Sequence, residues 1–102
     1  MISLNINQKS IEISFFHTNN NNEKSTKCNV RVNNHDYFEI AKVHYKDTFC
    51  RAAGRRYSLA KTLRTTNLNK EERKFVWFEY FKQTNKPLLA ESVMAKFELQ
   101  WD

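Results

Sequence analysis

The hydrophobic period of the sequence changes near residue 50, and that change limits the folds that the chain can adopt. Before it, apolar residues alternate with polar ones, as Ile2, Leu4 and Ile6 do, which is the period of a half-buried strand. After it, apolar residues recur at helical spacing. The alternation returns in residues 88–102, which predict a C-terminal strand. A sheet-forming half is therefore followed by a helical segment.

Polar clusters divide the sheet-forming half, residues 1–45, into four predicted strands. The clusters at residues 7–10 and 33–36 contain asparagine, which tolerates the backbone angles of tight turns. Residues 18–26 have the sequence TNNNNEKST and predict a mobile loop, because they contain nothing apolar to bury. The last strand of this half is predicted over residues 37–45.

Two helices are predicted within a basic helical hairpin, residues 46–84. The first, residues 53–65, has an apolar face with Leu59 beside it, and the face consists of Ala53, Tyr57, Ala60 and Leu63 or Arg64. Gly54, the only glycine, stands where this helix is expected to begin. It would let another backbone approach the helix N-terminus, which attracts anions.

The second predicted helix, residues 70–83, is preceded by Asn69 and has Glu72 at its third position, the pattern of a capping box. Its sequence KFVWFEYFKQ puts aromatic side chains around most of the helix circumference. A domain of this size does not easily bury all of them, so we expect some to be partly exposed, while for each one taken singly a place in the core stays the alternative. The candidates are Trp77, Tyr80 and Phe81.

Together these elements predict a single α+β domain over residues 1–102. Its antiparallel sheet has about four to five strands, and a two-helix hairpin packs on one face, in the order ββββααβ. A chain of 102 residues is long enough to build one hydrophobic core without a disulfide or a metal.

The net charge of +6 is concentrated in one part of the chain. Residues 41–68 hold seven of the seventeen basic residues and a single acid, Asp47. Such a concentrated patch is typical of surfaces that bind phosphates or acidic partners, and interleaved tyrosines can stack on bases. The predicted binding residues are Lys46, Arg51, Arg55, Arg56, Tyr57, Lys61, Arg64, Arg73, Trp77 and Tyr80.

Catalytic and metal-binding signatures are weak throughout. The histidines and cysteines show no close C-x-x-C or H-x-x-x-H spacing, so we expect no metal and no cofactor. Cys50 beside Arg51 could be a reactive thiol with His44 as its base. The simpler interpretation is that Cys28 and Cys50 are reduced structural thiols in a cytoplasmic protein. We therefore expect no enzyme activity.

No export signal and no membrane partner are expected. The first residues, MISLNINQKS, lack the basic and apolar regions of a signal peptide. No apolar run approaches the 18 residues or so that a membrane-spanning helix needs.

A His-x-x-Asp-x-Phe motif is followed by Gly-Arg-Arg, by Leu-Ala and by a second helix that contains Lys-Glu-Glu-Arg and a tryptophan. This arrangement, over residues 42–81, resembles a pattern in small phage-encoded accessory proteins. Leu59-Ala60 departs from the Ala-Leu order of that pattern. The matching residues are His44, Asp47, Phe49, Gly54, Arg55, Arg56, Leu59, Ala60, Leu63, Glu72, Arg73, Trp77 and Tyr80.

Small basic phage proteins without enzyme motifs are similar in kind to anti-defence proteins, of which anti-CRISPR inhibitors are the best-known sort. By this analogy we expect the chain to bind and inhibit a host defence complex in the host cytoplasm, first of all a CRISPR effector nuclease with its guide RNA. It would act as a monomer or homodimer through its basic and aromatic surface. The alternative is a phage protein that binds DNA or RNA directly, either without sequence preference or as a regulator.

Overall fold

Alternating hydrophobicity in the first half of the chain produces an antiparallel sheet. The computed structural model describes residues 1–20, 23–43, 51–84 and 86. The strands are β1 (Ile2–Ile6), β2 (Lys9–Asn20), β3 (Glu23–Val32) and β4 (His35–Val43). They lie in the order β1-β2-β3-β4, each antiparallel to the next.

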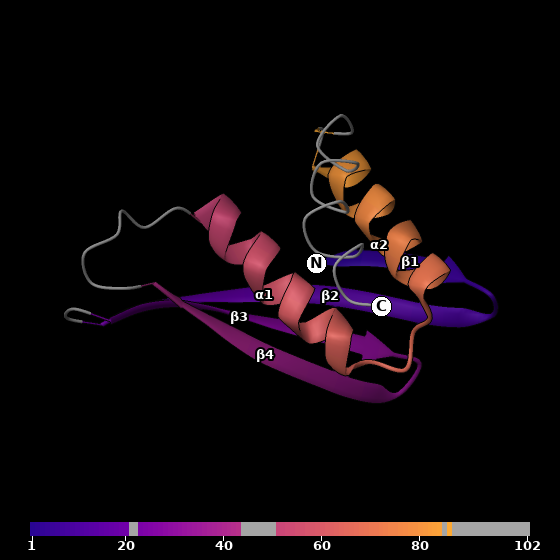
Figure 1. Cartoon of the computed structure of the whole chain (residues 1–102), viewed down its shortest axis with the longest axis horizontal. Coiled ribbons are helices and arrows are strands. Elements are labelled where there is room, and N and C mark those ends of the chain that lie inside the picture. The colour runs from indigo at the N-terminus through magenta and orange to yellow at the C-terminus, as the bar shows by residue number, and fades with distance from the viewer. Residues whose placement is uncertain (21–22, 44–50, 85, 87–102) are drawn as a thin grey trace.

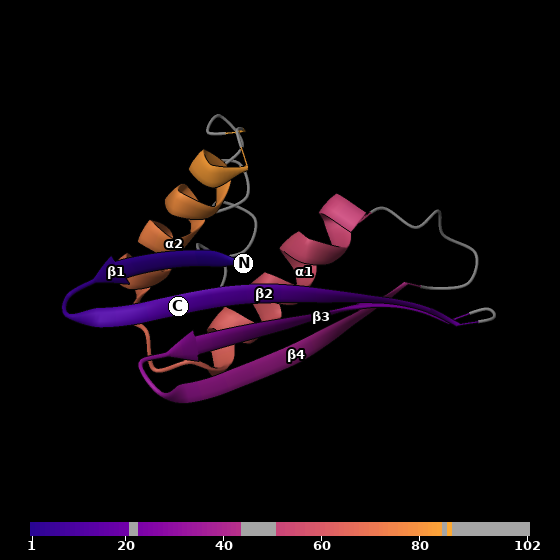
Figure 2. The same cartoon turned by 180° about the vertical axis from the view of Figure 1, so that it is seen from behind.

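Two helices, α1 (Arg51–Thr65) and α2 (Lys70–Gln83), pack on one face of this sheet (Figure 1). The α+β class and the order ββββαα agree with the sequence prediction. The predicted strand over residues 88–102 lies outside the described residues. Seen from behind, the strands lie in front of α1, and no described helix covers that face (Figure 2).

Asparagine residues form the tight turns of the sheet, as the sequence predicts. Asn7 and Gln8 join β1 to β2 with φ angles of 51° and 65°, and Asn33 begins the turn after β3 with a φ of 56°. Positive φ angles match the right-handed twist of the flanking strands. The Asn33 side chain also accepts a hydrogen bond from the backbone N–H of Ser10 at 3.0 Å.

The prediction of a loop over residues 18–26 is wrong for most of the segment. β2 continues to Asn20, β3 begins at Glu23, and the two strands stay paired up to these residues. Polar side chains also contact each other across the two strands, since Nδ1 of His17 lies 2.8 Å from Oγ1 of Thr26. The pairing that starts in the core satisfies the backbone of the polar extension and so overrides its low strand propensity.

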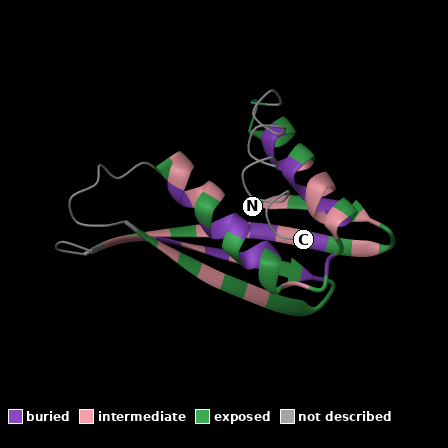
Figure 3. Ribbon diagram, viewed as in Figure 1, coloured by how far each residue is buried: buried purple, intermediate pink, exposed green. Residues whose placement is uncertain are grey.

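The helices and one face of the sheet share a hydrophobic core. Inward residues such as Ile11, Ile13 and Val30 are fully buried, and burial alternates along the strands (Figure 3). Helix α1 packs on β3 and β4, whereas α2 packs on β1. Phe15 meets Tyr80 edge to face with ring centroids 6.0 Å apart, which links β2 to α2.

The aromatic residues of α2 are more buried than the sequence predicts. Trp77, Tyr80 and Phe81 expose only 0%, 3% and 2% of their surface, so the expectation that some of them are partly exposed is wrong and the alternative, a place in the core, holds for each. Trp77 and Phe81 stack with centroids 6.0 Å apart, and Tyr80 meets each of them edge-on. These rings are buried by one another as well as by the sheet. Phe78 is the exposed aromatic residue of the helix.

The buried face of α1 agrees with the predicted one at Leu59, Ala60 and Leu63 and differs from it elsewhere. Gly54, Ser58 and Thr62 recur every four residues and are buried, whereas Tyr57 is exposed. The hydroxyl of Thr62 donates to the Ser58 carbonyl at 2.7 Å and lies 3.3 Å from the carbonyl oxygen of Cys28 in β3. Gly54 therefore lies inside the first turn, without a positive φ, and does not open the helix as predicted.

Candidate functional site

Positive charge collects at the N-terminal end of α1. Arg51 occupies the first turn, which contains no acidic residue, and Arg55 and Arg56 follow in the second turn. A helix N-terminus is itself positive, so cations there are unfavourable for the helix and raise the local positive potential. Together the helix end and its side chains form a strong attractor for anions.

A hollow lies between the N-terminal part of α1 and the C-terminal end of α2. Arg55, Arg56 and Lys86 supply three cations around it, and Nε of Arg56 donates to the carbonyl of Ala52 at 3.3 Å. Guanidinium groups match the geometry of phosphate oxygens, so the cations at the rim of this shallow hollow are suited to contact a phosphate group. The residues lining it are Ala52, Arg55, Arg56, Tyr80, Phe81, Thr84 and Lys86.

Arg51 and Arg55 also change the pKa of a histidine on the inner face of the sheet. Burial lowers the pKa of His17 in β2, and the positive charges of Arg51 and Arg55 lower it further. The fold therefore brings a residue of the sheet next to the basic end of α1. The sequence offers no signal for this neighbour, because only the packing of α1 across the strands creates it.

The charge continues along the exposed side of α1. Tyr57, Lys61 and Arg64 are exposed there. Nζ of Lys61 donates to the carbonyl of Ile40 at 2.8 Å, which places this cation beside β4, the last strand in the sheet that the described residues form. We call Arg51, Arg55, Arg56, Lys61 and Arg64 together the basic surface of α1. These residues wrap around the helix, because at about 100° per residue Arg55 and Arg64 lie on opposite sides of it.

The other predicted binding residues do not join this surface. Nη1 of Arg73 donates to the carbonyl of Leu68 at 2.9 Å, in the connection between the two helices. Trp77 is fully buried, and Tyr80 only lines the hollow, so neither can be the aromatic anchor that the sequence predicts. Lys46 lies outside the described residues.

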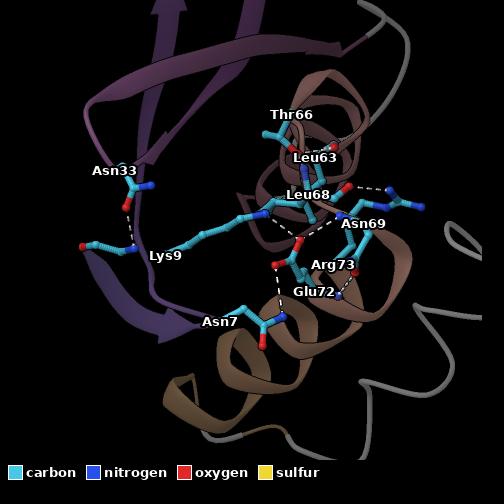
Figure 4. Close-up of polar contacts among 10 residues, drawn as sticks. Asn7, Lys9, Asn33, Leu63, Thr66, Leu68, Asn69, Glu72 and Arg73 are labelled. Atoms are coloured by element: carbon cyan, nitrogen blue, oxygen red, sulfur yellow. Dashed lines mark hydrogen bonds and ion pairs between the residues drawn. The ribbon is translucent and has the colours of Figure 1, made fainter.

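A second polar cluster, around Glu72, is structural (Figure 4). Its carboxylate accepts hydrogen bonds from Nζ of Lys9 at 3.0 Å, from Nδ2 of Asn7 at 3.2 Å and from the backbone N–H of Asn69 at 2.9 Å. These donors, led by the N–H of Asn69, hold the pKa of Glu72 below its usual range. The Asn69–Glu72 capping box is thus confirmed and also anchors α2 to the sheet.

The described residues hold little other reactive chemistry. Burial raises the pKa of the free Cys28 thiol to about 12, which makes it a poor nucleophile. No group of three or more His, Cys, Asp or Glu residues in the described part of the chain is placed to bind a metal ion. Neither described helix is long and apolar enough to cross a membrane.

Comparison of the chain with protein-family models, with curated proteins and with solved structures found no match. Function must therefore be inferred from the residues of this chain. The basic surface of α1 is the feature with the clearest binding chemistry.

Proposed function

We propose that this chain is a nucleic-acid-binding protein that contacts phosphate groups through the basic surface of α1. One observation carries the proposal: Arg51, Arg55 and Arg56 cluster at a helix N-terminus without an acidic residue in its first turn, and two of them line a hollow with Lys86. A cluster that costs helix stability is best explained by an anionic ligand that uses it.

Phosphate is a better match than an ordinary protein surface. Protein interfaces are anchored by a few aromatic and arginine residues in well-packed pockets. Trp77 and Tyr80, the aromatic residues expected to serve as anchors, are buried in the core. The N-terminal end of α1 is instead rich in arginine, which favours contacts with a nucleic-acid backbone.

The first test is binding of fluorescently labelled DNA and RNA oligonucleotides, measured by fluorescence anisotropy at several salt concentrations. Each phosphate contact releases counterions, so log K should fall linearly with log salt, by roughly 0.7 to 0.9 per contact. For three to five contacts we expect a slope of about −2 to −4.5. A flat salt dependence, or no binding near physiological salt, would overturn the proposal.

Charge reversal then tests the location of the site. The double variant Arg55→Glu/Arg56→Glu should lower affinity about 100-fold and reduce the salt slope by roughly 2. The matched control, Lys74→Glu/Lys82→Glu, makes the same change of charge elsewhere on α2. It should bind within about 3-fold of the unaltered protein once both variants are shown to fold by circular dichroism.

The second candidate function is inhibition of a host defence complex in the host cytoplasm, such as a CRISPR effector nuclease with its guide RNA. Exposed aromatic side chains beside the charged helices, Tyr57 on α1 and Phe78 on α2, favour this candidate because aromatic residues are enriched at protein interfaces. The RNA of such a complex would meet the same basic surface.

A pull-down with tagged protein, with and without nuclease treatment, separates the two candidates. A single effector protein that remains bound after nuclease treatment, and whose cleavage activity is blocked at equimolar inhibitor, supports the inhibitor. Retention of nucleic acid alone, lost on digestion, supports direct binding.

A further inference from the structure

The open face of the sheet, opposite the helices, carries an unusual set of side chains. Strand register places nine outward residues of β2, β3 and β4 in three rows. The rows are Ser14–Asn29–Phe38, Phe16–Lys27–Ile40 and Thr18–Ser25–Lys42. Phe16 and Phe38 are each 57% exposed and Ile40 is 38% exposed, although solvent-facing strand positions are normally polar. Exposed apolar groups gathered on one face mark a binding surface.

Lys27 stands at the centre of these rows. Its neighbours across the strands are Phe16 and Ile40, and its Nζ lies 4.5 Å from the centre of the Phe38 ring. The cation thus lies against an aromatic face, where it is held by a cation–π contact. Lys27 covers part of one face of the Phe38 ring, and both phenylalanines still remain more than half exposed.

The charge of this face selects the class of ligand. The three rows include two lysines and no acid. The adjoining row of the same face, Glu12–Arg31–Asp36, holds two acids and one arginine, and Arg31 pairs with Asp36 at 2.9 Å, so the positive charge lies at the end of the face around Lys27 and Lys42. Lys61 reaches the neighbouring β4 edge from α1 through its bond to the Ile40 carbonyl. Positive charge therefore runs from the open face, around the edge, to the basic surface of α1.

Flat aromatic rings with adjacent cations are the combination that binds single-stranded nucleic acid. Bases stack on the rings, whatever their sequence, while lysines contact the phosphates. The Cα atoms of Phe16 and Phe38 are two strands and two residues apart, which corresponds to about 12 Å, so each ring would take a separate base. Bases within a duplex stay stacked on each other and cannot lie on such a platform.

We propose that the open face of the sheet binds single-stranded DNA or RNA, with bases stacked on Phe16 and Phe38 and phosphates contacting Lys27, Lys42 and Lys61. This inference rests on the proposed nucleic-acid binding and adds a preference for single strands. The backbone of the bound strand continues around the β4 edge toward α1.

The test compares a 20-nucleotide oligothymidylate with a duplex of the same length, at one salt concentration, by fluorescence anisotropy. The protein should bind the single strand more tightly. Phe16→Ala/Phe38→Ala should lower single-strand affinity about 30-fold or more and leave the salt slope unchanged, because it removes stacking but no cation. The matched control Phe78→Ala, which removes an exposed ring on α2, should stay within about 2-fold.

A conservative variant separates stacking from folding. Phe16→Tyr/Phe38→Tyr keeps both rings and should retain single-strand affinity, with an unfolding temperature close to that of the alanine variant.

If the protein binds both oligonucleotides equally and the alanine variant binds as well as the unaltered protein, the open face is not used, although the proposed function stands. If nothing binds, the proposed function also fails. If sedimentation reveals a dimer that the alanine variant loses, the face belongs to a second copy of the chain and the inference is wrong.

Discussion

Lys9 and Glu72 are 63 residues apart in the chain, yet Nζ of Lys9 lies 3.0 Å from Oε1 of Glu72. The contact joins the start of β2 to the first turn of α2 (Figure 4). The Glu72 side chain is only 2% exposed, so its charge depends on the protein donors around it. One carboxylate therefore caps the helix and fixes the helix against the sheet.

Replacing Glu72 by Gln should destabilise the protein by about 2 kcal/mol at pH 7, because charged hydrogen bonds are replaced by neutral ones. The pKa of Glu72 is lowered in the folded state, so its contribution is present above its usual pKa of 4.5 and lost as pH falls through the folded pKa. Urea unfolding at pH 7 and pH 3 should show the difference shrinking at the lower pH.

The control is Glu71→Gln. Oε1 of Glu71 lies 3.6 Å from Nζ of Lys74 in an ion pair on the surface. A surface pair of this kind should change the free energy of unfolding by less than about 0.5 kcal/mol. An equal loss for Glu72→Gln at both pH values would mean that its charge is not the source of the stability.

The sequence is informative wherever a local pattern decides the structure. Alternation predicts the four strands of the first half, asparagine predicts the turns, and Asn69 with Glu72 predicts the cap of α2, and these are confirmed. The strand predicted over residues 88–102 lies outside the described residues. The partners Lys9 and Asn7 of Glu72 were not predictable, because they come from a distant turn and depend on how α2 sits on the sheet.

The errors arise where tertiary contacts override local composition. Residues 18–26 are polar and look like a loop, but pairing with a neighbouring strand extends the ladder through them. The arginines at the start of α1 were predictable as a cluster, whereas the approach of His17 was not. The spacing of the small residues Gly54, Ser58 and Thr62, every four residues, was a signal for the buried face of α1 that the sequence contained and the prediction did not use.

That small-residue face predicts a size limit at position 62. Thr62→Val keeps the shape but removes the hydroxyl that donates to the Ser58 carbonyl, so we expect a loss of about 1 kcal/mol. Thr62→Leu adds volume between α1 and β3 and should cost about 1 to 3 kcal/mol. Thr65→Val, on the exposed end of the helix, is the control and should stay within about 0.5 kcal/mol. Denaturant unfolding measures all three, and a Leu variant as stable as the original would show that α1 does not approach β3 closely.

The buried thiol of Cys28 should resist modification. Its pKa, raised to about 12 by burial, leaves almost no thiolate at pH 8. In a Cys50→Ser variant, where Cys28 is the remaining cysteine, a disulfide reagent such as DTNB should label the folded protein only as fast as it opens. Full labelling should follow on adding denaturant. Rapid labelling of the folded variant would contradict the burial of Cys28 beneath α1.

The pKa of His17 reports on the basic end of α1. Burial is the main cause of its lowering, and Arg51 and Arg55 add to it. Because the folded state favours the neutral ring, the stability that His17 contributes is present above its usual pKa of 6.5 and decreases as pH falls toward the folded pKa.

Arg51→Gln or Arg55→Gln should raise the pKa of His17, measured by NMR titration of the imidazole, while the control Lys82→Gln should leave it unchanged. A bound oligonucleotide should raise it as well, since its phosphates offset the same two charges. An unchanged His17 pKa in both arginine variants would mean that these side chains do not face the sheet, and binding without any shift would place the phosphates away from Arg51 and Arg55.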